Sequence, residues 1–245
     1  EDGTLRVWDV VTGQEAWSLR GNSGMYGVIF MPDGKRLVTA GQDGTARVWD
    51  AVSGQEMLTL AGNTSTVTSV VASPDGTHIT TSGYDGTLKI WDTAPGRELL
   101  TITAHTDIVW DIAYSPDGTH LATVGADGIA VLWDAVTGQF TRSLSPGDGL
   151  TSLAFSPDGG QLAVGSATGK VFILDSETGQ WVMTLPGHTY LVFDLAFSPD
   201  GSQLVTSSWD GTAKLWDLAS GRELLTFPEQ WSGVAFSSDG KSIFT

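Results

Sequence analysis

The sequence predicts an all-β protein, and three observations support this fold class. A Trp-Asp pair, Leu-Asp in one case, recurs six times in the 245 residues at steps of 41 or 42 residues. A turn of the Ser-Pro-Asp-Gly type recurs in the same phase. Between the turns, runs of about five residues alternate apolar and polar side chains, as half-buried strands do. Four short strands per repeat of about 42 residues predict the blades of a β-propeller.

Each repeat carries its markers in a fixed order. An Asp-Gly turn, Thr-Gly in one repeat, comes before the strand that ends in the pair, and a second glycine turn follows the pair. In the Ser-Pro-Asp-Gly turn, Pro sets φ at the first corner, Asp binds its own backbone and Gly accepts a positive φ. No window keeps a helical period long enough to compete. The six pairs are Trp8-Asp9, Trp49-Asp50, Trp91-Asp92, Trp133-Asp134, Leu174-Asp175 and Trp216-Asp217.

This pattern resembles the WD40 repeat family over the whole chain. The resemblance rests on four turn and strand markers that keep one phase, which is more specific than any single Trp-Asp pair. The Gly-His element of the family is less well kept. Gly187-His188 matches it, Ala104-His105 matches half of it, and Gly62-Asn63 has Asn in place of His. The resemblance implies blades arranged around a central channel.

The repeats predict a single domain over residues 1–245, a propeller of six four-stranded antiparallel blades. The sixth blade is expected to be shared between the two ends of the chain, which would remove the exposed sheet edges. The alternative interpretation is a fragment of a larger propeller that is cut in phase. The expected blades cover residues 25–61, 67–104, 109–144, 150–185 and 191–227, with 1–20 and 231–245 forming the shared one.

The composition excludes several kinds of site. The chain has no cysteine, so disulfides and thiolate ligands are excluded. No apolar run approaches the roughly 18 residues that span a bilayer, and we expect no membrane partner. No phosphate-binding glycine motif or calcium loop occurs, so we expect neither a cofactor nor a metal. No segment resembles a signal peptide, and although nothing names a compartment, we favour the cytoplasm.

The formal net charge is -16, from 12 basic and 28 acidic residues. A uniformly acidic surface repels the phosphate backbone, so we expect no nucleic-acid partner. The plainer interpretation of this charge is solubility. The sharper interpretation is a preference for a basic protein or peptide, bound by a monomeric domain.

The resemblance implies a buried hydrogen-bonded set in the well-kept repeats. It links the His of the Gly-His element, a Thr of the second strand, the Asp of the tight turn and the Trp. A buried carboxylate needs such donors, and in the Asn63 repeat an amide is expected to donate instead. The set resembles a catalytic triad, but it recurs from blade to blade, so we expect a structural role. The sets are His105, Thr123, Asp127 and Trp133, and His188, Thr206, Asp210 and Trp216.

The resemblance also implies a docking surface at the mouth of the channel. Two positions in each repeat are expected there, one in the first strand and one before the tight-turn Asp, and five of these residues are large aromatics. Such side chains are favoured at interface centres, and two acidic neighbours would suit a Lys or Arg of a peptide. The alternative is that the rings plug the channel. The candidates are Tyr26, Trp110, Phe193, Tyr84, Trp209, Asp111 and Asp194.

We therefore expect a non-catalytic scaffold or sensor module that docks a protein or peptide. Its regular repeats resemble WD40 arrays of large bacterial regulatory or signalling proteins. A designed or minimal propeller without a natural partner is an alternative. A propeller enzyme with a channel site is a weaker alternative, because Asp111 and Asp194 have neither a His nor a metal partner.

Overall fold

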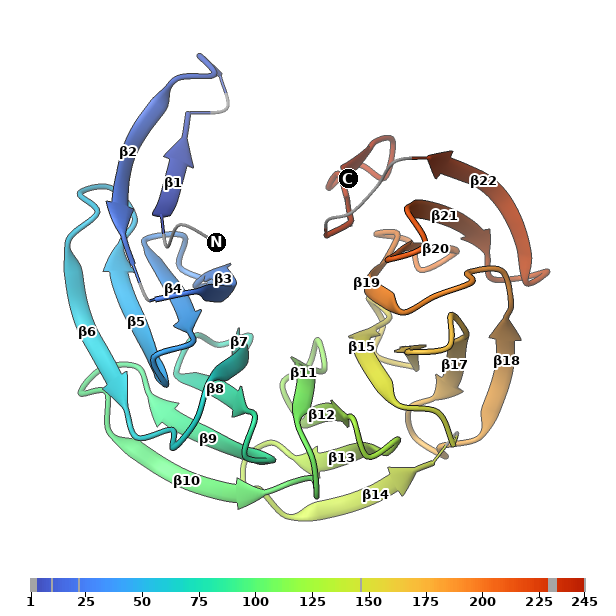
Figure 1. Cartoon of the computed structure of the whole chain (residues 1–245), viewed down its shortest axis with the longest axis horizontal. Coiled ribbons are helices and arrows are strands. Elements are labelled where there is room, and N and C mark those ends of the chain that lie inside the picture. Colours follow the sequence, from blue (N-terminus) through green and yellow to red (C-terminus); the bar gives the residue numbers. More distant parts are fainter. Residues whose placement is uncertain (1–3, 10, 22, 146, 229–232, 245) are drawn as a thin grey trace. The chain divides into compact units, whose positions relative to one another are not determined.

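The computed structural model describes residues 4–9, 11–21, 23–145, 147–228 and 233–244. Every regular element in these residues is a β-strand (Figure 1). Within the same residues, no helix is long and apolar enough to cross a membrane. The chain forms two compact units, residues 1–109 and 110–245. Consecutive strands pair within antiparallel sheets, and each four-stranded sheet is called a blade below, numbered in chain order.

The first unit holds a two-stranded sheet and the first two blades. The two-stranded sheet pairs β1 (Thr4–Trp8) with β2 (Glu15–Arg20). The first blade consists of β3 (Met25–Phe30), β4 (Arg36–Gly41), β5 (Thr45–Asp50) and β6 (Glu56–Ala61). The second blade consists of β7 (Val67–Ala72), β8 (His78–Gly83), β9 (Thr87–Asp92) and β10 (Glu98–Thr103).

The second unit holds three further blades and a two-stranded sheet. The third blade consists of β11 (Val109–Tyr114), β12 (His120–Gly125), β13 (Ala130–Asp134) and β14 (Phe140–Leu144). The fourth consists of β15 (Leu150–Phe155), β16 (Gln161–Ser166), β17 (Val171–Asp175) and β18 (Trp181–Leu185). The fifth consists of β19 (Val192–Phe197), β20 (Gln203–Ser208), β21 (Thr212–Asp217) and β22 (Arg222–Pro228). The last sheet pairs β23 (Ala235–Phe236) with β24 (Ile243–Phe244).

The predicted fold class is confirmed, because the described chain is all-β and repeats a four-stranded antiparallel blade. The two end sheets have two strands each. That they form one shared blade, and that residues 1–245 are a single domain, stay predictions. Parts of the predicted shared blade, residues 1–3, 10, 231, 232 and 245, lie outside the described residues.

The Ser-Pro-Asp-Gly turns hold the first two strands of a blade together through their own side chains. In the second blade, the Ser73 hydroxyl donates to the Asp75 carboxylate at 2.6 Å, and the Thr77 N–H donates to the same oxygen at 3.0 Å. These bonds, with the Thr77 hydroxyl, lower the pKa of Asp75 to about 2. Gly76 has φ of 70°, which an L side chain rarely adopts. The motif therefore encodes this turn locally.

Blades of one unit pack face to face through apolar side chains. In the first unit, Val38 and Val48 of the first blade form one buried cluster with Val70, Ile79 and Trp91 of the second. The second and third strands are buried on both faces along most of their length, because neighbouring sheets pack against them, and they form most of the core. The position of the degenerate pair is equally buried, with Leu174 at 1% exposure. A leucine therefore fills the place of the indole but brings no N–H group.

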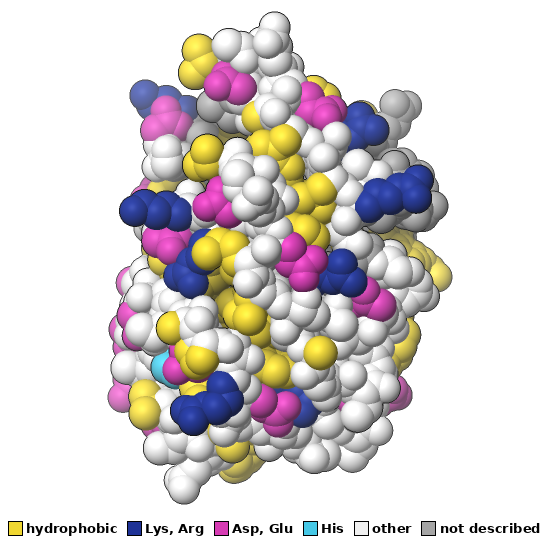
Figure 2. Space-filling view, turned by 90° about the vertical axis from the view of Figure 1, so that its left-hand side faces the viewer, with side chains coloured by type: hydrophobic (Ala, Val, Ile, Leu, Met, Phe, Trp, Pro, Cys, Tyr) yellow, Lys and Arg dark blue, Asp and Glu magenta, His cyan; other side chains and the backbone are white. Residues whose placement is uncertain are grey.

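Ion pairs join neighbouring strands in four of the described sheets, between the third and fourth strands in three blades and between β1 and β2 in the first two-stranded sheet. Figure 2 shows Lys and Arg side chains beside Asp and Glu side chains on one outer face. Exposed pairs of this kind contribute little to stability, about 0–1 kcal/mol each. The pairs are Arg6–Glu15, Arg47–Glu56, Lys89–Glu98 and Lys214–Glu223, at 3.8, 3.7, 2.9 and 2.8 Å.

Candidate functional site

The loop before β19 is held by a buried chain of four side chains in the fifth blade. The Trp216 indole N–H donates to the Thr206 hydroxyl at 2.9 Å, and that hydroxyl lies 2.8 Å from His188 Nε2. His188 Nδ1 lies 2.9 Å from an Asp210 carboxylate oxygen. The arrangement is satisfied when Trp216 donates to Thr206, Thr206 to His188, and His188 to Asp210. These four residues are the second set that the sequence singled out.

The charges in this set follow from burial and hydrogen bonding. Burial lowers the pKa of His188, and the Asp210 carboxylate only partly offsets it. For Asp210, burial acts to raise the pKa. Donors from Thr212, Thr189 and His188 outweigh it and lower the pKa to about 2. At neutral pH the pair is therefore a neutral imidazole that donates to a carboxylate, which excludes a charged His–Asp pair.

The other set is divided between the two units, since His105 lies in the first and Thr123, Asp127 and Trp133 lie in the second. Within the second unit, Trp133 Nε1 donates to the Thr123 hydroxyl at 3.1 Å. Asp127 accepts the N–H of Ile129 at 3.2 Å, which closes its own tight turn. The His105 side chain is buried.

The Asn63 repeat differs from the expectation that its amide would donate. The Thr81 hydroxyl, which accepts the Trp91 indole N–H at 3.0 Å, donates to Asn63 Oδ1 at 3.2 Å. The amide nitrogen Nδ2 of Asn63 is buried and has no hydrogen-bond partner. Asp85 takes its donor from the Thr64 hydroxyl instead. The physical reason is that an amide is shorter than an imidazole, so one side chain does not bridge Thr81 and Asp85.

Three large aromatic side chains are exposed together on the fifth blade. Tyr190, Phe193 and Trp209 are 55%, 45% and 50% exposed. The rings of Tyr190 and Trp209 are stacked, with centroids 6.3 Å apart and planes at 23°. The name "aromatic cluster" is used for these three residues below. Sequence reasoning identified Phe193 and Trp209 but missed Tyr190.

The buried set fixes the backbone that carries this cluster. Asp210 accepts the N–H of Thr189 at 2.9 Å, so the tight turn is tied to the loop before β19. The Ser208 hydroxyl donates to the Tyr190 carbonyl at 3.0 Å, and the Trp209 N–H donates to the Leu191 carbonyl at 3.0 Å. The stacked rings therefore stand on two segments that are bonded to each other. A signal for Tyr190 existed, because the matching loop positions hold Ser65 and Asp107.

The first unit has its own exposed aromatic pair, Tyr26 and Tyr84. These residues are 50% and 39% exposed, and their ring centroids are 6.4 Å apart. The hydrogen bond that the Tyr84 hydroxyl donates to Tyr26, together with partial burial, raises the pKa of Tyr84. These two candidates, one from the first blade and one from the second, are thus brought together by the fold. Trp110, in the second unit, is half-buried at the start of the third blade.

Asp111 and Asp194 were expected to lie beside the aromatic rings with carboxylates free for a partner. The structure corrects this expectation, because both carboxylates bind backbone N–H groups. Asp111 accepts the N–H of Leu153 in the next blade at 3.0 Å. Asp194 accepts the N–H of Val234, beyond the fifth blade, at 2.8 Å. Burial raises the pKa of Asp194 despite these backbone donors. Both carboxylates bind the backbone that follows, because at this position of the first strand a side chain reaches the next sheet.

In the second and fourth blades the hydrogen bond runs in the opposite direction, from a side-chain hydroxyl to a backbone carbonyl of the next first strand. The Thr151 hydroxyl donates to the Val192 carbonyl at 2.6 Å, and the Thr68 hydroxyl donates to the Val109 carbonyl. The first strands therefore alternate between an aromatic residue and a Thr that bonds the next strand. Among the described residues, no group of three or more His, Asp or Glu side chains is placed to hold a metal ion.

The comparison with known families agrees with the strand order and the turns described above. A family model for the first beta-propeller of IFT122 matches residues 24–245, about nine-tenths of the chain. None of the curated proteins matches the chain. The resemblance to WD40 repeats is confirmed by this match, since that propeller is of the WD40 type. The chain belongs to the family of IFT122 first beta-propellers, which are propeller domains of the scaffold type.

Proposed function

We propose that this chain is a non-catalytic docking module that binds a protein or peptide through the aromatic cluster of Tyr190, Phe193 and Trp209. The observation that carries the proposal is the exposure of three large rings, each 45% to 55%, on hydrogen-bonded backbone. Rings that are held in place lose little conformational freedom on binding, so their burial by a partner is favourable. The pair of Tyr26 and Tyr84 is a second docking point of the same kind.

The partner we propose is a basic segment with an apolar anchor. The net charge of -16 attracts such a segment from a distance, and the faces of Trp209 and Tyr190 accept a Lys or Arg by cation–π contact. Asp111 and Asp194 are not part of this interaction, because their carboxylates bind backbone N–H groups. We place the module in a larger regulatory or signalling protein.

The experiment compares partner capture by three proteins. The test variant is Y190A/F193A/W209A, and the matched control is F140A/W181A, which removes two rings of similar exposure, 59% and 49%, from outer strands. We expect a partner segment, once isolated, to bind the wild type and the control alike. We expect the test variant to bind it at least about a hundredfold more weakly, as loss of interface hot spots does. Equal binding by all three proteins would refute the proposed site.

The charge of the partner is tested separately. Binding of the isolated segment is measured at low and at high salt, and with its Lys and Arg residues replaced by Gln. We expect a slower association rate at high salt, because exposed charges are screened beyond about 10 Å at 0.1 M salt. An association rate that does not depend on salt would argue against a basic partner and would leave the aromatic cluster as the docking site.

A further inference from the structure

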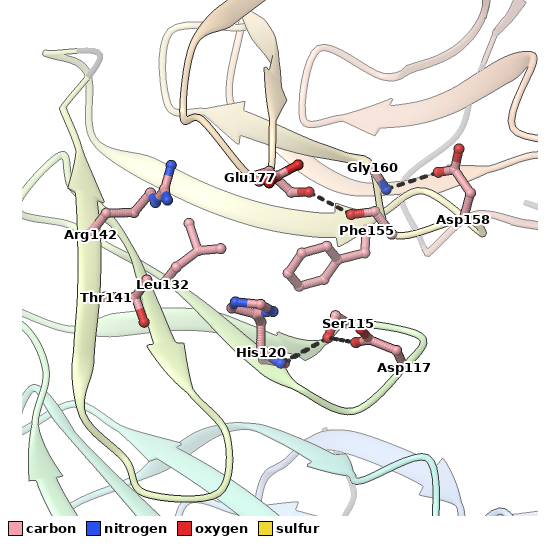
Figure 3. Close-up of a pocket in the computed structure, with 12 residues that line it drawn as sticks. Ser115, Asp117, His120, Leu132, Thr141, Arg142, Phe155, Asp158, Gly160 and Glu177 are labelled. Atoms are coloured by element: carbon pink, nitrogen blue, oxygen red, sulfur yellow. Dashed lines mark hydrogen bonds between the residues drawn. The ribbon is translucent and has the colours of Figure 1, made fainter.

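A cavity of about 260 Å³ lies between the third and fourth blades, away from the aromatic cluster. Figure 3 shows Arg142 entering from β14 and Glu177 from the turn after β17, with Leu132, His120 and Phe155 between and below them. The cavity is slightly smaller than the roughly 300 Å³ at which pockets for drug-sized molecules begin. A ligand that fits it is therefore small.

Arg142 is a charged residue at a position where the other sheets have an apolar one. The residue that pairs with the middle of the third strand is Arg142 in the third blade, opposite Leu132. In the five other described sheets that have a strand pair of this kind, that residue is apolar, and Trp17, Leu58 and Met183 lie against the glycine of a turn in the next sheet. Those residues are Trp17, Leu58, Leu100, Met183 and Leu225. A guanidinium group thus stands where the fold otherwise places a hydrocarbon.

Glu177 is an exception of the same kind on the other side of the cavity. It is the second residue after Asp175 of the degenerate pair, and all five corresponding residues are apolar. Those residues are Val11, Val52, Ala94, Val136 and Ala219. The two exceptions, one basic and one acidic, line the same cavity although they belong to different blades.

The two charges do not neutralise each other by direct contact. Within the described part of the chain, no ion pair within 4 Å joins Arg142 or Glu177 to an opposite charge, although the more distant charge of Arg142 helps to lower the pKa of Asp175. A side chain at Gly179 would meet Arg142 at 3.4 Å, so the Arg142 side chain lies over the turn that carries Glu177. Opposite charges that share a cavity without touching are what a dipolar ligand would bridge.

The remaining carboxylates around the cavity are already satisfied. Asp117 accepts the Ser115 hydroxyl at 2.6 Å and the Thr119 N–H at 3.0 Å. Asp158 is held in the same way by Ser156 and Gly160, at 2.6 and 2.9 Å. Asp175, which does not line the cavity, accepts the N–H and hydroxyl of Thr178, both at 2.6 Å. Glu177 is therefore the carboxylate that remains for a cationic group of a ligand.

We propose that this cavity binds a free α-amino acid, with the ligand carboxylate on Arg142, its ammonium group on Glu177 and its side chain against Leu132 and Phe155. His120, whose Nδ1 is bonded to the Thr119 hydroxyl at 2.8 Å, adds a further polar group to the wall. The site is independent of the aromatic cluster, and would allow a docking module to respond to a small metabolite.

The test titrates each free α-amino acid, one at a time, into the whole chain and measures binding by calorimetry. We expect at least one to bind. Its N-acetyl derivative lacks the ammonium group and its methyl ester lacks the carboxylate, so each should bind about ten- to a hundredfold more weakly. No binding of any free amino acid up to about 10 mM, an affinity too weak to be specific, would overturn the proposal. Binding of both derivatives as tight as that of the free amino acid would also overturn it.

Two single-residue variants complete the test. Arg142→Leu and Glu177→Val place residues that the other blades carry at these positions, so both should fold. Each should weaken binding about ten- to a hundredfold, whereas the control Arg222→Leu, on the outer strand of the fifth blade, should not. Unchanged binding in both variants would refute the site. The free energy of unfolding of both single variants and of the double variant is also measured without ligand. If the two losses of stability are not additive, the charges pair with each other, and the proposed site is refuted.

Discussion

Replacing Thr206 by Val removes one hydroxyl from the buried set and leaves the shape almost unchanged. Thr206 is fully buried, and its hydroxyl bonds both the Trp216 indole N–H and His188 Nε2, at 2.9 and 2.8 Å. The variant leaves these two polar atoms buried without partners. Each such atom costs about 1–3 kcal/mol, and because the two share one site the costs are not fully additive. We expect a loss of about 2–4 kcal/mol in the free energy of unfolding.

The assay is thermal and urea unfolding of wild type, Thr206→Val and Thr206→Ser. For a chain of this size, 1 kcal/mol corresponds to about 2–4 °C in Tm, so Thr206→Val should melt about 4–16 °C lower. Thr206→Ser keeps the hydroxyl and loses only a methyl group, which costs about 1 kcal/mol. The reasoning is refuted if Thr206→Val is as stable as the wild type, or if Thr206→Ser is the less stable of the two variants.

Three further predictions concern other polar groups. Asn63→His should raise Tm by a few degrees, about 1 kcal/mol, because the buried Nδ2 of Asn63 has no partner; a lower Tm in a thermal melt would contradict this. The pKa of Asp210 is about 2 in the folded chain against an ordinary 3.8, so the stability it contributes, about 2 kcal/mol, is present above pH 4 and lost as pH falls towards 2. Urea unfolding of wild type and Asp210→Asn should therefore converge in that window, and a constant difference would be evidence against it. Asp194→Ala removes the acceptor of the Val234 N–H, so that amide should exchange its hydrogen at least about tenfold faster, while the Leu153 amide, bound to Asp111, serves as the control.

Most of the fold was predictable because its signals are local. The Ser-Pro-Asp-Gly turns bond within themselves, as the Ser73 and Asp75 contacts show, and they need no neighbour to form. Strand alternation likewise acts over about five residues. The recurrence of these signals predicted the all-β repeat, the antiparallel blades and the family resemblance, all of which are confirmed.

The candidate site was less predictable, and its individual residues show why. Phe193 and Trp209 could be selected by their place in the repeat, but Tyr190 is defined as part of the cluster only by its stacking on Trp209. Asn63 was expected to donate, but which of its atoms meets Thr81 depends on the distance between two loops and a strand. Residue type alone predicts neither the stacking of Tyr190 on Trp209 nor the distance between Asn63 and Thr81.

What the sequence by itself determined is the repeated strand and turn pattern, since each turn is stabilised by atoms only a few residues apart. The tertiary structure alone decided which polar side chains meet water and which meet another blade. Asp111 and Asp194 look like free acidic neighbours of aromatic rings in the sequence, yet each binds a backbone N–H about one repeat further along, at Leu153 and Val234. Arg142 and Glu177 come to line one cavity in the same way. The physical reason is that burial and hydrogen bonding depend on distance in space, and the packing of one blade on the next sets that distance.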